Sequence, residues 1–193
     1  IDWKESHILL KTAFPTEINA DKATYDIQFG TVERPTHKNT SWDAAKFEVC
    51  AHKFADLSEY GYGVSLLNDC KYGYDIHDSV IRLTLIKCGN YPNPDADKCR
   101  HEFTYSLFPH SGDFREAGTV KLAYLLNSPL EAKKIESQNG TLPEEYSLLS
   151  IDSENVICET VKNAEDGDGV IVRLYECCNS RANVNLTLGF DFD

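Results

Sequence analysis

The sequence lacks the short motifs that mark several common enzyme classes. It contains no glycine-rich phosphate-binding loop, no Gly-x-Ser-x-Gly nucleophile motif and no His-Glu-x-x-His metal motif. No apolar run approaches the roughly 20 residues that span a bilayer as a helix. These absences exclude the common nucleophile motifs and indicate a soluble globular protein.

Positive charge is also scarce. Lysine and arginine together number 19, against 31 aspartate and glutamate residues, so the formal net charge is −12. Nucleic-acid binding draws its affinity from clustered cations that neutralise phosphates. The charge balance therefore argues against nucleic acid as a partner.

Methionine is absent, and the cysteines do not pair in a recognisable way. The seven cysteines are an odd number without a Cys-x-x-Cys pair, which favours reduced thiols in a cytosolic protein. A bridge between Cys88 and Cys99, which bracket a loop, is the alternative. Because the chain opens at Ile1 and closes on Phe190–Asp193, within a strand-like pattern, we expect it to be a fragment of a longer protein.

The dominant hydrophobic period is two residues, which is typical of strands with one buried face. Tyr25, Ile27 and Phe29 alternate with polar residues, which predicts a strand that buries these three side chains. The acidic, glycine-rich run Ala164–Gly169 predicts a hairpin turn. Similar patterns predict further strands at Ile8–Phe14, Phe47–Ala51, Gly63–Asn68, Ile81–Leu85, Phe103–Leu107, Tyr146–Ser150, Val156–Val161, Val170–Tyr175 and Val184–Phe190.

One segment departs from this period. Between Arg115 and Asn127 apolar residues recur at spacings of three and four, which predicts one short helix. Loops are predicted at Glu33–Asp43, at the proline-containing Gly89–Asp97 and at Glu136–Glu145. Many strands with almost no helix favour an all-β fold, a large antiparallel β-sandwich, and nothing marks a second domain.

Two of the loops could carry chemistry but have simpler structural interpretations. In Arg34–Asp43, Trp42 could stack on a sugar, or it could close one end of the sandwich. His101 and Glu102, with His110 further along, suggest a metal site. Adjacent residues of a strand point to opposite faces and no third ligand has a fixed spacing, so we predict no metal site in this chain.

The turn that follows the predicted strand Gly63–Asn68 is the third concentration of polar groups. Asn68, Asp69, Lys71 and Tyr72 place an amide, a carboxylate, an ammonium group and an aromatic ring close together. Such a set suits a polyol ligand. The alternative is a hairpin with an exposed charge pair worth less than about 1 kcal/mol.

Four long runs carry a family resemblance. In chain order they are RPTHKNTSWD, KFEVCAHKFADLSE, YGVSLLNDCKYGYD and RHEFTYSLFPH. In this order and at these separations they resemble the C-terminal β domain of family 38 glycoside hydrolases, in particular the cytosolic and bacterial α-mannosidases. The resemblance begins at Ile1, is strongest before Pro109, and departs at Ala44 and Phe54, where members often carry tryptophan.

The resemblance implies that residues 1–193 are the C-terminal β-sandwich domain of a longer enzyme, with the super-sandwich fold of mutarotase-like proteins. The enzyme would be a retaining α-mannosidase, in which an aspartate nucleophile and a second carboxyl group act through a covalent glycosyl-enzyme. Its zinc, nucleophile and acid would belong to an N-terminal catalytic domain and a helical segment outside this chain. The resemblance therefore assigns no catalytic residue and no zinc ligand here.

The expected role of this domain is to brace the catalytic domain of the same chain and to add loops to the cleft that binds an α-mannoside oligosaccharide. By similarity, the turn from Asn68 to Tyr72 would reach that cleft, with Asn68, Asp69, Lys71 and Tyr72 as substrate-binding candidates. The expected location is the cytoplasm, and no membrane partner is expected.

Two other hypotheses remain open from the sequence. The first is a free-standing carbohydrate-binding module that stacks sugars on Trp42, Tyr72 and Tyr74. Against it, most aromatic residues alternate into the predicted core instead of forming a strip on one sheet face. The second is an inert scaffold that makes no contact with sugar.

Overall fold

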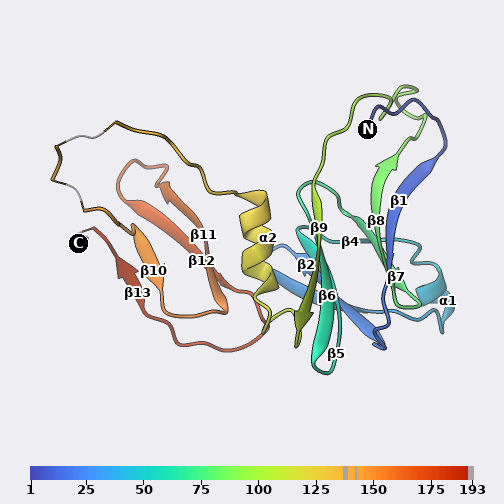
Figure 1. Ribbon diagram of the computed structural model, residues 1–193, viewed down its shortest axis with the longest axis horizontal. Helices are drawn as coiled ribbons and strands as arrows, with labels where there is room; N and C mark the ends of the chain where they lie inside the picture. Colours follow the sequence, from blue (N-terminus) through green and yellow to red (C-terminus); the bar gives the residue numbers. More distant parts are fainter. Residues whose placement is uncertain (137–138, 142, 191–193) are drawn as a thin grey trace. The chain divides into compact units, whose positions relative to one another are not determined.

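The computed structural model describes residues 1–136, 139–141 and 143–190 (Figure 1). The chain divides into two compact units, Ile1–Pro129 and Leu130–Asp193. The prediction that residues 1–193 are one domain of a longer enzyme stays a prediction. The elements are β1 (Leu9–Pro15), β2 (Lys22–Ile27), β3 (Gly30–Pro35), α1 (Ser41–Ala44), β4 (Val49–Cys50), β5 (Phe54–Glu59), β6 (Tyr62–Asn68), β7 (Gly73–His77), β8 (Val80–Lys87), β9 (Tyr105–Ser111), α2 (Thr119–Asn127), β10 (Leu149–Ile151), β11 (Val156–Asn163), β12 (Val170–Glu176) and β13 (Leu186–Leu188).

The first unit is an antiparallel β-sandwich. One sheet has five strands in the order β3-β2-β5-β6-β9, and the other has four in the order β1-β8-β7-β4. The core lies between them, where alternate residues of each strand face the opposite sheet. The rings of Tyr25 and Tyr74 meet across this core with their centroids 6.5 Å apart. The all-β sandwich predicted from the sequence is confirmed.

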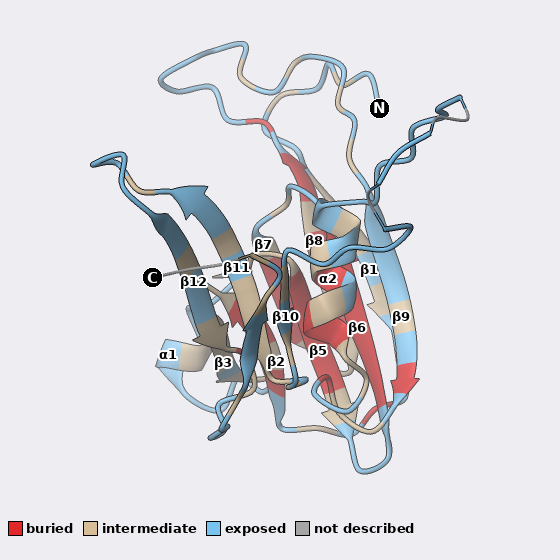
Figure 2. Ribbon diagram, turned by 90° about the vertical axis from the view of Figure 1, so that its left-hand side faces the viewer, coloured by how far each residue is buried: buried red, intermediate tan, exposed pale blue. Residues whose placement is uncertain are grey.

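A second buried layer lies on the outer face of the five-stranded sheet. There α2 packs on β5 and β6 and buries Val120 and Ala123. Just before the helix, the ring of Phe114 packs on that of Phe54, with centroids 5.9 Å apart. As a result β5 and β6 are buried on both faces (Figure 2). In the described part of the chain, no helix is both long and apolar enough to cross a bilayer.

The second unit consists of two small antiparallel ladders. Strands β11 and β12 form one, and β10 and β13 form the other. The predicted hairpin turn at Ala164–Gly169 is confirmed: the N–H of Ala164 donates to the carbonyl of Gly169 at 3.0 Å. Gly167 and Gly169 both adopt positive φ there, which glycine does without a steric penalty.

Several local predictions were wrong. Phe29 is exposed, because the strand ends at Ile27 and Phe29 takes a left-handed conformation in the turn that follows. Phe47 is also exposed, since strand β4 has only two residues. A second helix, α1, follows Thr40, whose side chain caps it.

Other predictions fall partly outside the described residues. The closing segment Phe190–Asp193 and the loop Glu136–Glu145 both include such residues. The loop Gly89–Asp97 contains no strand, as predicted. All seven cysteines are free thiols in the structure, so the bridge between Cys88 and Cys99 is not formed.

Candidate functional site

The turn from Asn68 to Tyr72 follows β6, and the side chain of Asn68 holds it in shape. Asn68 is 1% exposed. Its Oδ1 accepts hydrogen bonds from the backbone N–H groups of Cys70 and Lys71, and its Nδ2 donates to the carbonyl of His52 at 3.0 Å. These bonds occupy the amide, so Asn68 shapes the turn and is not free to meet a ligand.

Asp69 is exposed but anchored to the segment that precedes β9. Its Oδ2 accepts from the backbone N–H of Thr104 at 2.9 Å, and its own N–H donates to the carbonyl of Thr104 at 3.1 Å. Partial burial acts to raise the pKa of Asp69. Hydrogen bonds from Cys70 and Thr104 outweigh this effect and hold the pKa below its ordinary value. The carboxylate is therefore charged at neutral pH.

Lys71 and Tyr72 point to different neighbours. The ammonium group of Lys71 lies over the ring of Phe103, 4.7 Å from its centroid. Tyr72 is 58% exposed and meets the ring of His52 edge-on at 5.5 Å. Two of the predicted sugar contacts, Lys71 and Tyr72, therefore lie against different aromatic rings.

A polar pocket of about 180 Å³ opens beside this turn. The turn contributes Asp69, Cys70 and Tyr72 to its wall. The other lining residues are His52 and Lys53, from the segment before β5, and Asn127, from the end of α2. Such a mixture of donors and acceptors beside an aromatic ring can bind hydroxyl groups.

Two pocket residues are fixed by partners of their own. The ammonium group of Lys53 is 3.1 Å from the buried carboxylate of Asp26 and lies over the ring of Tyr124 at 4.6 Å. The side chain of Asn127 donates to the backbone carbonyl of Asn68 at 3.0 Å. The pocket is therefore formed in advance of any ligand.

The polar residues of the turn were predicted as a site from the sequence, whereas the other half of the pocket was not. His52, Lys53 and Asn127 come from segments that the sequence separates from the turn. His52 and Lys53 lie in one of the four family runs, but no pattern connects them or Asn127 to the turn, because only the pairing of β5 with β6 and the docking of α2 bring them to Asp69.

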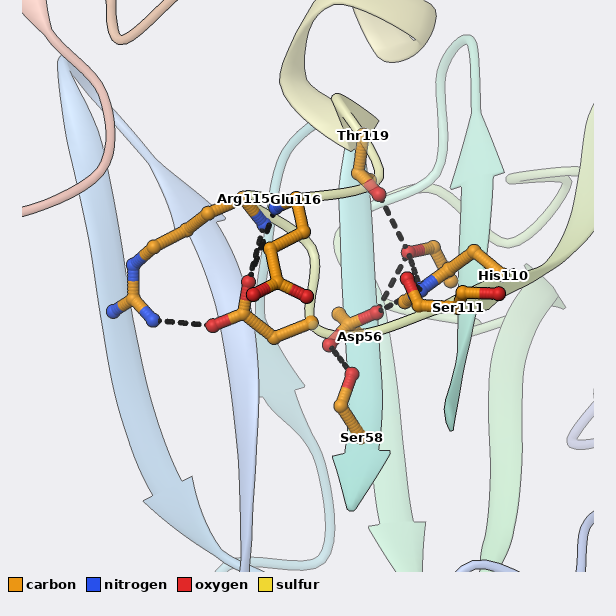
Figure 3. Close-up of polar contacts among 9 residues, drawn as sticks. Asp56, Ser58, His110, Ser111, Arg115, Glu116 and Thr119 are labelled. Carbon is orange, nitrogen blue, oxygen red and sulfur yellow. Dashed lines mark hydrogen bonds and ion pairs between the residues drawn. The ribbon is translucent and has the colours of Figure 1, made fainter. Parts of the chain in front are cut away.

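The strongest concentration of buried polar groups lies elsewhere, under the start of α2 (Figure 3). The imidazole Nε2 of His110 is 2.8 Å from Oδ2 of Asp56 and 3.1 Å from Oγ of Ser65. Ser65 Oγ also donates to Asp56 at 2.7 Å and lies 3.0 Å from Oγ1 of Thr119. The cluster links β5, β6, β9 and α2.

This cluster contains serine, histidine and aspartate, but its geometry is not that of a catalytic triad. A triad needs the serine and the aspartate on different nitrogens of the imidazole. Here both contact Nε2, and Ser65 is 0% exposed. Burial lowers the pKa of His110, but the hydrogen bond and charge of Asp56 outweigh burial and raise the pKa. The cluster is a buried polar connection between these elements.

No metal site forms from the described residues, which bring together no group of three potential His, Cys, Asp or Glu ligands. His101 bonds the carbonyl of Asp97 at 2.7 Å, whereas His110 belongs to the buried cluster. In the first predicted loop, Trp42 is 81% exposed, so it does not close the end of the sandwich.

Two family models match the sequence. Residues 1–95 match the model described as the glycosyl hydrolases family 38 C-terminal domain. Residues 155–193 match the model of the family 38 C-terminal beta sandwich domain. The chain belongs to glycosyl hydrolase family 38. Its two matches are both to C-terminal parts of that family, as the sequence runs predicted.

Curated relatives of this family 38 chain are named α-mannosidases. It is 45% identical to Alpha-mannosidase 2C1 of Homo sapiens over 191 residues, which is 97% of this chain and 18% of that protein. It is 44% identical to Alpha-mannosidase G of Dictyostelium discoideum, over 97% of this chain and 17% of the relative. The chain thus spans less than a fifth of the length of these relatives.

The same fold occurs in solved structures. An α-mannosidase from Enterococcus faecalis V583 superposes with a TM-score of 0.82 at 21% identity, over 93% of this chain and 21% of the other. A second family 38 structure from Enterococcus faecalis gives a TM-score of 0.80 over 94% of this chain and 22% of its own. These matches support the family 38 β fold.

Proposed function

We propose that this chain is the non-catalytic C-terminal β domain of a retaining α-mannosidase that removes terminal α-linked mannose from oligosaccharides. The observation that carries the proposal is identity of 44–45% to proteins named α-mannosidases over 97% of the chain. In the described residues, the one serine–histidine–aspartate cluster is buried and has the wrong geometry for catalysis. The nucleophile and acid would therefore lie in an N-terminal catalytic domain of the same protein.

In this proposal the domain braces the catalytic domain and lends the turn Asn68–Tyr72 to the substrate cleft. The preformed pocket beside the turn supports that role, because Asp69 and Tyr72 offer an acceptor and a ring to sugar hydroxyls. Asn68 acts by holding the turn. Lys71 does not line this pocket, and its ammonium group lies over the ring of Phe103, so it would contact sugar outside the pocket.

Zinc belongs to the proposed full-length enzyme and not to this chain. The described residues hold no group of three potential ligands, so they do not fit a zinc site. The metal would be bound by the catalytic domain. We expect a chelator to abolish mannosidase activity of the protein translated from the complete reading frame, without shifting the thermal unfolding of the chain 1–193.

The proposed role of the turn is tested by kinetics of that complete protein on an α-linked mannobiose. We expect Asp69→Ala to raise KM about three- to tenfold, as loss of one or two hydrogen bonds to substrate would. Asp166→Ala, which removes an exposed turn carboxylate in the second unit, serves as the matched control. Unchanged kcat and KM for both Asp69→Ala and Lys71→Ala would mean that the domain is an inert scaffold that makes no contact with sugar.

The alternative proposal is a free-standing carbohydrate-binding module. Exposed Trp42 and Tyr72 favour it, but Tyr74, its third predicted platform, is fully buried in the core. Calorimetry of the chain 1–193 with mannose oligosaccharides separates the two proposals. Measurable affinity of the chain alone would favour the module, and we expect none.

We also propose a cytoplasmic location. Seven free thiols in one chain are consistent with a reducing compartment. Fractionation of cells that carry the tagged complete protein tests this location, and recovery in a secretory fraction would contradict it.

A further inference from the structure

The core-facing side of edge strand β9 is left uncovered. Residues directly opposite each other on β6 and β9 point to the same face. Leu66 and Leu107 form such a pair, yet Leu66 is 0% exposed and Leu107 is 41% exposed. The next pair on that face shows the same difference, since Asn68 is 1% exposed and Tyr105 is 38% exposed. The four-stranded sheet therefore covers β6 and stops short of β9, which Figure 2 shows as largely exposed.

The edge of the four-stranded sheet on this side is β1. The ring of Phe14, from β1, lies 6.0 Å from that of Tyr105 in an edge-on contact. In the described part of the chain β1 pairs with β8 alone, so its other edge carries no strand. We call Phe14, Tyr105 and Leu107 the open side of the sandwich. It combines an uncovered apolar strip with a free sheet edge.

The start of the chain is held beside this open side. The amino group of Ile1 donates to the carbonyl of His101 at 2.9 Å, and the N–H of His101 donates to the carbonyl of Ile1 at 2.7 Å. Ile1 also lines a hollow of about 470 Å³ together with Leu85, Phe103 and Tyr105. Polypeptide joined to Ile1 would therefore emerge beside the open side.

Strand β9 is the less suitable of the two edges for a further strand. Backbone polar groups alternate in direction along a strand. Thr104 directs both its N–H and its carbonyl towards Asp69, on the β6 side. The corresponding groups of Tyr105, Leu107 and Pro109 therefore face outwards. Proline has no N–H, so a ladder along β9 would be interrupted at Pro109, inside the strand. The proline of β1, Pro15, is its last residue, so β1 is the better edge.

We propose that an extended segment of the polypeptide before Ile1 lies along β1 as an added strand and covers Leu107 with apolar side chains. The inference rests on the proposed function. This chain covers only 17–18% of the length of the α-mannosidases it resembles, so a complete protein of that kind has the additional polypeptide that the inference requires. It identifies the surface through which this domain is joined to the rest of the enzyme. The open side adjoins the turn Asn68–Tyr72. The ring of Phe103 stacks on that of Tyr105, and the ammonium group of Lys71 lies over the same Phe103 ring.

Hydrogen exchange read by mass spectrometry tests the inference. The protein translated from the complete reading frame is compared with the chain 1–193, in peptides that cover β1. We expect exchange in β1 to be slower by about tenfold or more in the complete protein, because an added strand would protect its outward N–H groups. Equal exchange in the two proteins would overturn the inference.

A substitution in the complete protein gives a second measurement. Leu107→Lys places a charge under the proposed segment and should return β1 to fast exchange. Leu125→Lys is the matched control, since Leu125 is 51% exposed on α2. If Leu107→Lys leaves β1 protected, Leu107 is not covered and the inference fails. Protection of β1 in the chain 1–193 that appears only with dimerisation would identify a second copy as the occupant and also overturn it.

Mannosidase activity, measured on the same sample, separates this inference from the proposed function. Activity without protection of β1 would overturn the inference and leave the function standing. Protection of β1 without activity on any α-mannoside would overturn the proposed function and leave the inference standing.

Discussion

Single residues decide whether the candidate site keeps its shape, and Asn68 is the clearest case. One side chain accepts from two backbone N–H groups of the turn and donates to the carbonyl of His52. A buried amide that satisfies several backbone groups is expensive to remove, because those groups lose their partners while shielded from water.

We therefore predict that Asn68→Ala lowers the free energy of unfolding by about 2–3 kcal/mol. Urea denaturation of the chain measures the change. Asn93→Ala is the control, because Asn93 also accepts from a backbone N–H, that of Asp95, but in an exposed loop. Equal effects of the two substitutions would show that Asn68 has no special structural role.

His110 makes stability depend on pH. Its pKa is raised in the native state because the hydrogen bond and charge of Asp56 outweigh burial. A raised native pKa means that the stabilising contribution is complete below the unfolded value of about 6.5 and is lost as pH rises through the native value. Wild-type stability should therefore contain a contribution that declines from about pH 6.5 upwards.

The test compares urea denaturation of the wild type and His110→Gln at several pH values. At pH 6 the substitution should cost about 3 kcal/mol, because it removes the ionisable partner of the buried Asp56 and leaves it only the hydrogen bonds from Ser58 and Ser65. The difference between the two proteins should shrink towards high pH. A difference in unfolding free energy that stays constant from pH 6 to pH 9 would contradict a raised native pKa of His110.

At the scale of elements, the outer layer of the five-stranded sheet depends on the segment that leads into α2. Phe114 is 2% exposed, and Gly118 starts the helix in a left-handed conformation. The helix itself is only nine residues long, so packing and not intrinsic propensity stabilises it.

We predict that Phe114→Ala costs about 3–5 kcal/mol, from the lost contact with Phe54 and the cavity left behind. Phe47→Ala is the matched control, since Phe47 is 80% exposed and its loss should cost less than about 0.5 kcal/mol. Thermal unfolding followed by near-ultraviolet circular dichroism measures both. A small effect at Phe114 would mean that α2 is not held through this contact.

Which strands can be recognised from the sequence depends on how each strand is buried and on its residues. Strand β8, whose buried residues alternate with partly exposed ones, was found because its apolar residues alternate. Of the two strands that are buried on both faces, β6 was predicted at Gly63–Asn68 and β5 was missed, because apolar and polar residues do not alternate in the run Phe54–Glu59. Strand β3 was missed because it contains glycine and ends in proline, which edge strands tolerate.

The candidate site was likewise half predictable. A turn rich in polar residues after a buried strand pointed to Asp69 and Tyr72. The other half, His52, Lys53 and Asn127, depends on long-range pairing and helix docking, for which local sequence carries no signal. The amide of Asn68 was assigned to substrate, whereas the structure uses its hydrogen bonds within the turn.

At the scale of the whole molecule, we propose that catalysis and structural support belong to different parts of one protein. The described residues supply a sandwich, a preformed polar pocket and an uncovered apolar side. They bring together no group of three potential metal ligands, and their serine–histidine–aspartate cluster is buried. These features suit a domain that completes an active site formed by another part of the same protein.

The most direct test of this claim is one assay of two proteins with an aryl α-mannoside. The account predicts that the protein translated from the complete reading frame releases the aryl group and that the chain 1–193 at equal concentration releases none above the buffer rate. Turnover by the chain 1–193 alone, or failure of the complete protein to cleave any α-mannoside, would contradict it.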